Sequence, residues 1–348
     1  MSTPPLRIGV VGAGANTRSM HIPGFQRQDG VEVVSVANRS RESGERAAAA
    51  FGIPKVYDRW EDLVADDNSD AICIGTWPYM HGPVTLAALE AGKHVLCEAR
   101  MAMNAAEAHR MLAATKEHPG LVAQVVPAPF SFGVDATVAE LIRDGFLGDL
   151  LAADVRATGD EFIDVAAPMT WRQDLELSGL NIMAMGIWYE TLMRWVGPAV
   201  RVCAMTKINV PERVDASGRR REIGIPDHVD VLARMACGAN ASLRVSTVTG
   251  LAAANMIALY GSEGTLVYDA PSGLRGGRRG DAGLVELEIP EDKRGGWRVE
   301  EEFVNAVRGE EAVKFTTFED GVRYMEFTEA VTRSAANGIA MDLPLAHA

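Results

Sequence analysis

The sequence has few cysteines and no metal-binding pattern. Its four cysteines form no CxxC pair, which argues against a disulfide framework and against structural zinc. The seven histidines lack the HxxxH and HExxH spacings of zinc enzymes. We therefore expect no bound metal and four small buried side chains at Cys73, Cys97, Cys203 and Cys237.

Long apolar runs and positive charge are also lacking. No stretch approaches the roughly 18 consecutive apolar residues of a membrane span, and the opening residues contain no apolar core of a signal peptide. The formal net charge of -13 repels both nucleic-acid phosphates and anionic membranes. These features predict a cytoplasmic protein whose partner is a small molecule, not a nucleic acid or a membrane.

Two patterns of apolar segments divide the 348 residues. Between residues 6 and 126, apolar segments of strand length alternate with helical segments. Parallel strands must be joined by a crossover, usually a helix, so this alternation predicts a doubly wound parallel sheet of the Rossmann type. We place this α/β domain at residues 1–127.

After residue 127 strands follow one another without intervening helices, which indicates an α+β domain with a large, mostly antiparallel sheet over residues 128–348. The patterns predict helices near 134–144, 181–196 and 319–336, and strands at 150–158, 199–209, 228–237, 240–250, 254–260 and 264–269. The stretch 271–283, rich in glycine and arginine, is predicted to be a surface loop with solvated arginines.

The first strand ends in a glycine-rich segment that matches two thirds of a GxGxxG dinucleotide fingerprint. Gly12 permits a tight turn, and Gly14 lets the backbone and the next helix N-terminus approach a pyrophosphate. The third glycine is replaced by Thr17, so a simple glycine turn at the sheet edge is the alternative. Its place after the first strand of a βαβ unit favours a nucleotide site, to which we assign Gly12, Gly14, Ala15 and Asn16.

The second strand ends in Asn38-Arg39-Ser40, without the acidic residue that accepts a hydrogen bond from a ribose 2′-hydroxyl. Arg39 and the Ser40 hydroxyl can instead hold a 2′-phosphate by charge-assisted hydrogen bonds. We therefore predict NADP(H) rather than NAD(H). A solvated Arg39, with Asn38 bonded to a ribose diol, is the alternative that would suit NAD(H).

Two later segments follow strands of the same sheet. Ligands of doubly wound sheets lie outside the carboxyl ends of the strands, so both segments should line the nicotinamide part of the crevice. They add Thr76, Trp77, Pro78, His81, Glu98 and Ala99 to the predicted cofactor site. A structural histidine that caps a helix is the alternative for His81.

Three motifs carry a likeness to a known family. The runs Asp70-Ala-Ile-Cys-Ile-Gly-Thr76, Ala91-Gly-Lys-His-Val-Leu-Cys-Glu98 and Tyr260-Gly-Ser-Glu-Gly264 resemble the Gfo/Idh/MocA oxidoreductases, and the similarity covers nearly the whole chain in order. The resemblance implies an N-terminal Rossmann domain and hydride exchange with sugars or cyclitols. It also implies a C-terminal domain whose open sheet supports a homodimer or homotetramer.

This chain departs from the family at the catalytic positions. The family relies on a Glu-Lys-Pro segment and on an Asp followed four residues later by a His; here the segment is Glu98-Ala99-Arg100, and Ala184 and Trp188 occupy the other positions. An alanine or an indole cannot accept the hydroxyl proton of a carbinol, and such acid-base help is worth roughly 10² to 10⁴ in rate. Another group must therefore supply it if the chain is an enzyme.

The helix predicted over 181–196 offers two replacements. At 100° per residue Asn181 shares the face of position 188, and Tyr189 is the flanking phenol that is long enough to reach back around the helix. We take both as candidate catalytic residues. The alternatives are a helix-capping Asn181 and a Tyr189 packed in the core.

Trp77 and Trp188 give the predicted substrate site aromatic walls, which suit a flat, apolar or glycosidic substrate. The sequence thus predicts an NADP(H)-dependent oxidoreductase of sugar-derived, cyclitol or aromatic-bearing small molecules. The alternatives are a dinucleotide-binding sensor without catalysis, and a lyase or glycosidase that uses bound NAD(P) transiently. The substrate candidates are Trp77, Arg100, Trp171, Arg172, Asn181, Trp188 and Tyr189.

Overall fold

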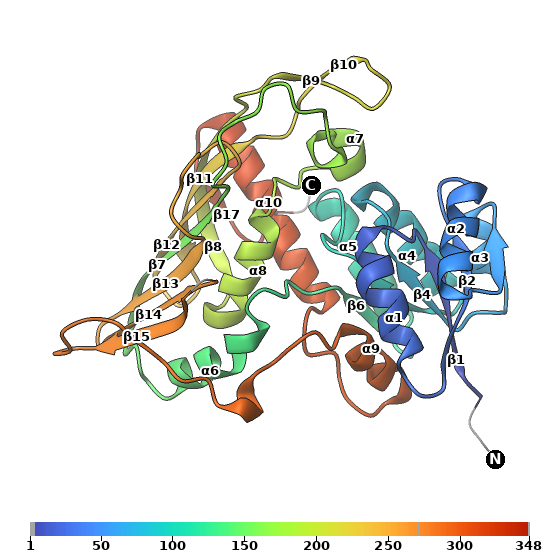
Figure 1. The fold of residues 1–348 in the computed structure, drawn as a ribbon. Coiled ribbons are helices and arrows are strands. Elements are labelled where there is room, and N and C mark those ends of the chain that lie inside the picture. The colour runs from blue at the N-terminus through green and yellow to red at the C-terminus, as the bar shows by residue number, and fades with distance from the viewer. Residues whose placement is uncertain (1–3, 271, 347–348) are drawn as a thin grey trace. The chain divides into compact units, whose positions relative to one another are not determined.

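The computed structural model describes residues 4–270 and 272–346, which form two compact units (Figure 1). The first unit comprises the chain up to Pro127 together with Arg298–Val322, and the second comprises Ala128–Trp297 and the chain from Arg323. The chain passes from the first unit to the second between Pro127 and Ala128. The return of Arg298–Val322 to the first unit has no counterpart in the predicted domains. Pro271 of the predicted loop lies outside the described residues.

The first unit contains a six-stranded parallel sheet in the order β3-β2-β1-β4-β5-β6. This confirms the predicted Rossmann architecture, because the chain reverses its direction of winding beside β1. The central strands carry fully buried Ile, Val and Leu side chains, as a sheet covered on both faces requires. The strands are β1 Leu6–Val11, β2 Val31–Ala37, β3 Lys55–Tyr57, β4 Ala71–Ile74, β5 His94–Cys97 and β6 Ala123–Val125.

Short helices connect these strands. Helix α2 begins after Ser40, whose hydroxyl accepts a hydrogen bond from the Ser43 N–H, and it ends at Gly52 in the left-handed conformation. The turn after β1 forms a π-helical segment, η1, before α1 continues it. The helices are η1 Thr17–His21, α1 Ile22–Gln26, α2 Arg41–Phe51, α3 Trp60–Ala65, η2 Pro78–Met80, α4 His81–Glu90, α5 Ala105–Glu117 and α9 Val299–Arg308.

The second unit is built on a nine-stranded sheet in the order β16-β15-β14-β13-β7-β12-β11-β8-β17. Only the β7–β12 pair is parallel, which confirms the predicted mostly antiparallel sheet. A separate hairpin joins β9 Glu212–Val214 and β10 Arg220–Glu222. The strands of the large sheet are β7 Leu150–Thr158, β8 Ala199–Lys207, β11 His228–Met235, β12 Asn240–Ser246, β13 Met256–Gly261, β14 Gly264–Asp269, β15 Gly273–Arg278, β16 Val285–Glu286 and β17 Met341–Asp342.

The prediction of a loop over 271–283 was wrong, because β15 pairs with β14 there. The many glycines of this strand are typical of a loop, so composition did not predict it. Gly276 is required for close packing, because a Cβ there would lie 3.1 Å from the Phe146 ring. Two arginines of this stretch keep solvent exposure, as predicted, and also form ion pairs. Arg275 pairs with Asp269, and Arg279 pairs with Glu263.

Helices cover one face of the nine-stranded sheet, where α8 and α10 lie side by side (Figure 1). The inward side chains of the central strands are buried there, among them Val155, Val231 and Leu243. The helices of this unit are α6 Phe132–Arg143, η3 Trp171–Gln173, α7 Leu175–Ser178, α8 Met185–Val196 and η4 Glu291–Lys293; α10 Phe318–Asn337 begins in the first unit.

The predicted start of the α8 helix was wrong by four positions. Met183 adopts φ +45° and Ala184 is the N-cap, so the helix begins at Met185. Asn181 therefore precedes the helix, and the helical-wheel argument that placed it on the face of Trp188 does not apply to it. The apolar residues of segment 181–196 correctly predicted a buried helix, but their pattern did not show at which residue the helix begins.

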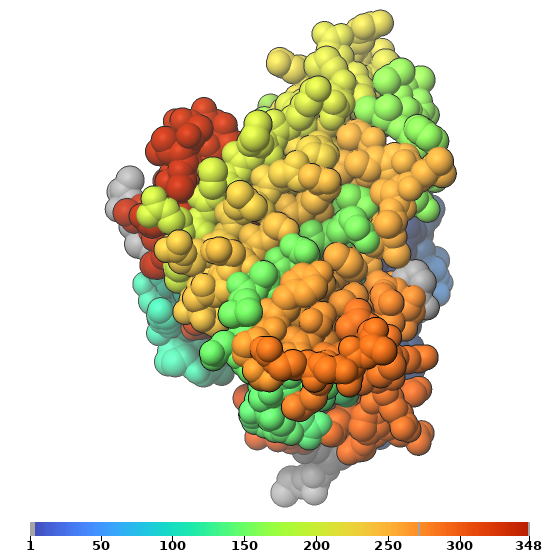
Figure 2. Space-filling model, turned by 90° about the vertical axis from the view of Figure 1, so that its left-hand side faces the viewer, coloured from blue at the N-terminus to red at the C-terminus, as the bar shows by residue number. Residues whose placement is uncertain are grey.

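The helices that Figure 1 draws in the described part of this unit lie on one side of the sheet, and Figure 2 looks toward the other side. Met205 and Leu232 point outward there, with 78% and 67% of their surfaces exposed. Cys203 lies on this face opposite Leu232 and is exposed, as is Cys237, whereas Cys73 and Cys97 are buried. The prediction of burial was thus wrong for two cysteines, because an apolar strand with two faces does not reveal which face is covered. In the described part of the chain no helix is long and apolar enough to cross a membrane.

Candidate active site

The turn after β1 is closely packed against the end of β4. Gly12 adopts φ +87°, and a Cβ on it would lie 2.6 Å from Thr76 Cγ2 and 2.8 Å from the Thr76 backbone nitrogen. Gly75 compensates for the missing third fingerprint glycine, since a Cβ there would lie 1.9 Å from the Thr17 hydroxyl oxygen. The ends of β1 and β4 can therefore lie close together because each is followed by a glycine, Gly12 and Gly75. The turn thus exposes backbone instead of side chains.

A crevice of about 320 Å³ opens along this turn in the first unit. Arg39 places its guanidinium 5.4 Å from the ring centre of Trp77, at cation–π distance. Asn38 is fixed by two contacts: its Oδ1 accepts a hydrogen bond from the Ala13 N–H at 2.7 Å, and its Nδ2 donates to Ser43 Oγ at 3.0 Å. The crevice is lined by Gly12, Ala13, Gly14, Asn38, Arg39, Ser40, Ser43, Arg46, Gly75, Thr76, Trp77 and Tyr79, none of them acidic.

These residues fit a nicotinamide dinucleotide. Gly12 and Gly14 leave room for a pyrophosphate against the backbone, and Thr76 Oγ1 is buried without a partner in the described structure. Seven of the thirteen predicted cofactor residues line the crevice, and two more, Ala15 and Asn16, follow Gly14 in the same turn. Within the described residues, no group of three or more His, Cys, Asp or Glu side chains is arranged to hold a metal ion.

His81 and Pro78 are buried beside this crevice rather than lining it. The two ring nitrogens of His81 lie 2.9 Å from the Arg100 carbonyl oxygen and 3.0 Å from that of Thr76. Burial lowers the pKa of His81 despite these carbonyl contacts. The imidazole ties the start of α4 to the segment after β5, which favours the structural alternative. Arg100 is itself buried.

Glu98, which follows β5, is part of a buried polar cluster. His21 Nε2 donates to Glu98 Oε1 at 2.9 Å, Asn16 Nδ2 donates to the same oxygen, and the Ala99 N–H donates to Oε2 at 3.0 Å. On the other side of the imidazole, His21 Nδ1 lies 2.5 Å from Glu300 Oε1. Sequence reasoning found Asn16, Glu98 and Ala99 but missed His21 and Glu300, because 279 residues separate this pair.

The two candidate catalytic residues of the second unit are both buried. Tyr189 stacks on Phe327 at 3.6 Å between ring centres, and its hydroxyl accepts a hydrogen bond from the Ala199 N–H at 2.8 Å. Burial raises the pKa of this phenol. Asn181 donates from Nδ2 to the Ser178 carbonyl oxygen at 2.7 Å. These contacts favour the packing alternative for Tyr189 and a local structural role for Asn181.

Aromatic side chains surround the start of α8 in place of the missing polar groups. Trp188 is half-buried, with its ring centre 4.2 Å from that of Phe130. Trp171 is also half-buried, and the Arg172 guanidinium lies 4.4 Å from its ring centre. Both indole rings keep part of their surface exposed, and their contact with a substrate stays a prediction.

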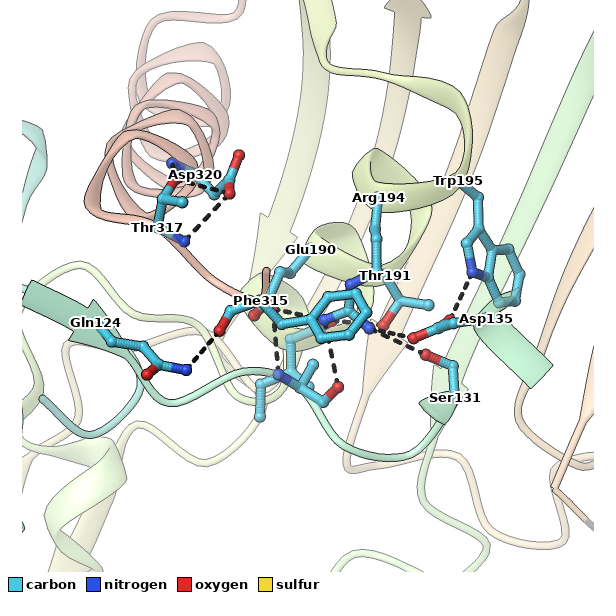
Figure 3. A network of polar contacts seen from close by, with 12 residues as sticks. Gln124, Ser131, Asp135, Glu190, Thr191, Arg194, Trp195, Phe315, Thr317 and Asp320 are labelled. Carbon is cyan, nitrogen blue, oxygen red and sulfur yellow. Dashed lines mark hydrogen bonds and ion pairs between the residues drawn. The ribbon is translucent and has the colours of Figure 1, made fainter. Parts of the chain in front are cut away.

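A network of charges fixes α8 against α6 (Figure 3). Arg194 bonds Asp135 at 2.5 Å and Glu190 at 2.9 Å, and Trp195 Nε1 donates to the other Asp135 oxygen at 2.7 Å. Glu190 also accepts a hydrogen bond from the Ala128 N–H at 3.1 Å. Both carboxylates are therefore held by Arg194 at the contact between α8 and α6.

Two family models match the chain. Residues 6–125 match the oxidoreductase family with an NAD-binding Rossmann fold, and residues 136–267 match the GFO/IDH/MocA C-terminal domain. The chain belongs to the Gfo/Idh/MocA oxidoreductase family. The predicted resemblance is thereby confirmed, and the chain is an NAD(P)-dependent oxidoreductase of this family.

Individual relatives agree with this assignment. The chain is 31% identical over 251 residues to trans-1,2-dihydrobenzene-1,2-diol dehydrogenase of Mus musculus, covering 71% of this chain and 70% of the mouse protein. The WlbA dehydrogenase from Bordetella pertussis, solved with NADH and UDP-GlcNAcA, matches with TM-score 0.79 and 25% identity over 98% of this chain and 100% of that one. A levoglucosan dehydrogenase solved with NADH and L-sorbose shares the fold, with TM-score 0.84 and 23% identity over 99% and 100% of the two chains.

Proposed function

We propose that the protein is an NADP(H)-dependent oxidoreductase that transfers hydride to or from a carbon–oxygen group of a sugar-derived, cyclitol or aromatic-bearing small molecule. The observation that carries the cofactor choice is the composition of the crevice after β2. Arg39, Ser40, Ser43 and Arg46 line it, and no acidic side chain does. A 2′-phosphate would meet the Arg39 guanidinium and two hydroxyls there, beside Arg46, which is paired with Glu42.

The contacts of Asn38 support this choice. It occupies the end of β2, where an acid would bind a ribose diol, and its Oδ1 already accepts the Ala13 N–H. Its amide therefore stabilises the turn of the crevice instead of offering a negative charge to the ribose. The neighbouring Arg41 is engaged elsewhere, in ion pairs with Glu45 and Asp58, which leaves Arg39 as the guanidinium beside Trp77.

The aromatic side chains of the second unit support the substrate class. Trp188 with Phe130, and Trp171 with Arg172, offer ring faces suited to a flat or cyclic molecule that stacks on them. The names of the mouse relative and of the levoglucosan dehydrogenase describe a cyclic diol and an anhydrosugar as their substrates. A ring that bears a secondary hydroxyl is the chemistry common to both.

Calorimetric titration of the purified protein with NADP⁺ and with NAD⁺ tests the cofactor. We expect tighter binding of NADP⁺, and equal binding or a preference for NAD⁺ would contradict the proposal. Absorbance at 340 nm then tests the reaction with trans-1,2-dihydrobenzene-1,2-diol, levoglucosan and myo-inositol. Stoichiometric reduction of NADP⁺ by at least one of these compounds is the expected result.

A second function, a dinucleotide-binding sensor without catalysis, is favoured by Ala99, Ala184 and Trp188 at the family's catalytic positions. Tight dinucleotide binding without turnover of any of the three compounds would support the sensor and contradict the oxidoreductase. Oxidation followed by elimination, with no net change at 340 nm but a changed product, would instead support the lyase or glycosidase alternative.

We further propose that the outer face of the nine-stranded sheet joins copies of the chain into a homodimer or homotetramer. Met205 and Leu232 are exposed apolar side chains on the neighbouring strands β8 and β11, and the Asp230–Arg244 pair lies beside them. Light scattering should show an oligomer that Leu232→Asp dissociates, and a monomeric wild-type protein would contradict this. The exposed free thiols of Cys203 and Cys237 are consistent with the reducing cytoplasm as its proposed compartment.

A further inference from the structure

His21, Glu98 and Glu300 form a buried row of ionisable side chains in the first unit. The side chains of His21 and Glu300 are 0% and 3% exposed, whereas that of Glu98 is 14% exposed. The row thus begins at the buried carboxylate of Glu300, continues through the buried imidazole of His21 and ends at the partly exposed carboxylate of Glu98. Glu98 lies at the carboxyl end of β5, the edge of the sheet where ligands of this fold bind.

Several features of the chain make this row possible. His21 is the last residue of the π-helical segment η1, a rare geometry that occurs frequently at functional sites. Gly24 makes room for Glu300, because a Cβ at position 24 would lie 2.5 Å from Glu300 Cδ. Glu300 itself comes from the segment Arg298–Val322 that returns to this unit. Three separate parts of the chain therefore converge on one imidazole.

The pKa values of His21 and Glu98 are shifted in opposite directions, each toward its charged form. Burial of His21 opposes its charged form, but the hydrogen bonds to Glu300 and Glu98 outweigh burial and raise the pKa of His21 to about 9. Burial likewise raises the pKa of Glu98, yet the hydrogen bond and charge of His21 hold it below its ordinary value. The contact between His21 and Glu98 therefore favours the charged form of both side chains.

Burial disfavours the charged form of three other titratable groups on the elements near Glu98, and the buried cation Arg100 follows two residues after it. Burial raises the pKa of the thiols of Cys73 on β4 and Cys97 on β5, and it lowers the pKa of His81 on α4. Glu98 itself accepts hydrogen bonds from His21, from the Asn16 amide and from the Ala99 N–H.

We propose, on the basis of the function proposed above, that Glu98 accepts the substrate hydroxyl proton in place of the family's missing groups, and that His21 and Glu300 are positioning residues that hold its carboxylate oriented and ionised. In oxidation the substrate O–H bond breaks and the proton bonds to a Glu98 carboxylate oxygen. The C–H electron pair leaves with the hydrogen as hydride to the oxidised dinucleotide, and the alcohol becomes a carbonyl. Reduction reverses both transfers.

The chemistry of the neighbouring positions leads to the same assignment. Ala99 has no group that can accept a proton, and the indole of Trp188 donates only. Tyr189 is occupied by the Ala199 N–H and stacked on Phe327. Glu98 instead combines a carboxylate, a place at the ligand edge of the sheet and partial exposure.

A titration of the imidazole resonances tests the row without any turnover. The histidine side chains are ¹⁵N-labelled, and the resonance absent from His21→Gln identifies His21. We expect a midpoint near 9 in the wild-type protein, and a midpoint lower by about one pH unit or more in Glu300→Gln, since an opposite charge in contact shifts a pKa by roughly that much. A wild-type midpoint near the ordinary value of 6.5 would overturn the role of Glu300.

Kinetics with NADP⁺ and the most active of the three test compounds examine Glu98 itself. Glu98→Gln should lower kcat by roughly 10² to 10⁴, the range for loss of general acid-base help, while the Kd of NADP⁺ stays within about twofold. Glu300→Gln should lower kcat less and move the inflection of its pH profile to lower pH. If the three side chains had only a structural role, the inflection of the kcat pH profile would not move in Glu300→Gln.

Glu302→Gln is the matched control. Glu302 is a buried carboxylate on the same helix α9, but it accepts hydrogen bonds from the backbone N–H groups of Lys314 and Phe315 rather than from His21. We expect this variant to keep the wild-type pH profile and the wild-type His21 midpoint. If Glu302→Gln moved both as much as Glu300→Gln does, loosening of α9 would explain the effect and the proposal would fail.

The outcomes separate this proposal from the one on which it rests. A folded wild-type protein that binds neither dinucleotide, or that turns over none of the compounds, contradicts the proposed function. Binding and turnover in the wild type together with unchanged kcat in Glu98→Gln leave the proposed function standing and overturn the role of Glu98 alone.

Discussion

The ligand edge of the first unit and the start of α8 in the second unit differ in what their polar groups do. At the sheet edge, Glu98 keeps partial exposure and a charged partner in His21. Around α8, Tyr189, Glu190 and Arg194 are engaged in stacking, hydrogen bonds and ion pairs within the fold. The difference indicates that the chemistry of this protein is concentrated in its dinucleotide-binding unit, and that the second unit contributes shape and ring faces.

The largest expected effect comes from Gly12→Ala. The new Cβ would combine a positive φ with a contact of 2.6 Å to Thr76 Cγ2, so the turn must move, and we expect dinucleotide binding to weaken by roughly 100-fold or more. Gly52→Ala is the control, because Gly52 also has positive φ but no atom within 4 Å of the added Cβ. Calorimetry should show near-normal binding in the control, and equal losses in both variants would contradict the close packing at Gly12.

Arg39→Ala should follow in size. Loss of a charge-assisted contact to a 2′-phosphate is expected to weaken NADP⁺ binding by about 10- to 100-fold, with little change in the Kd of NAD⁺. Arg41→Ala removes a nearby guanidinium that is paired with Glu45 and Asp58 instead, and it should preserve the preference. An equal loss for both coenzymes in Arg39→Ala would show that Arg39 stacks on adenine and does not select the phosphate.

The charge of His21 should also appear in the stability of the protein. Because its folded pKa is about 9 against an ordinary value of 6.5, the pairing stabilises the fold fully below pH 6.5, and this stability is lost as the pH rises through 9. The loss amounts to something on the order of 2–3 kcal/mol. Denaturant unfolding across this range should show a smaller loss in Glu300→Gln, and identical pH dependence in both proteins would contradict the buried pairing.

The smallest expected effect is that of Tyr189→Phe. The stack on Phe327 survives, and the Ala199 N–H loses its acceptor, so the free energy of unfolding should fall by about 1–2 kcal/mol. We expect kcat to stay within about twofold of the wild type. A large fall in kcat with normal stability would return Tyr189 to the list of catalytic residues and shift the chemistry toward the second unit.

Much of the candidate site could be predicted from local sequence. The Gly12 turn, the Arg39 and Ser40 pair and the Thr76-Trp77 segment all follow strands of a parallel sheet, and the carboxyl ends of such strands share one edge. The roles of Asn181 and Tyr189 could not be judged in the same way. A helical wheel assumes that one helix includes both residues. This is not so here, because Met183 has a positive φ and the helix begins only at Met185.

The sequence by itself determined the class of the two domains, the nucleotide turn and the family, because hydrophobic periodicity and short motifs are local properties of the chain. Only the tertiary structure revealed the strand hidden in the glycine-rich stretch, the exposed cysteines and the pairing of His21 with Glu300 across 279 residues. Such pairings depend on which distant segments pack together. In this protein that packing, of α9 against α1, brings the second carboxylate to the imidazole.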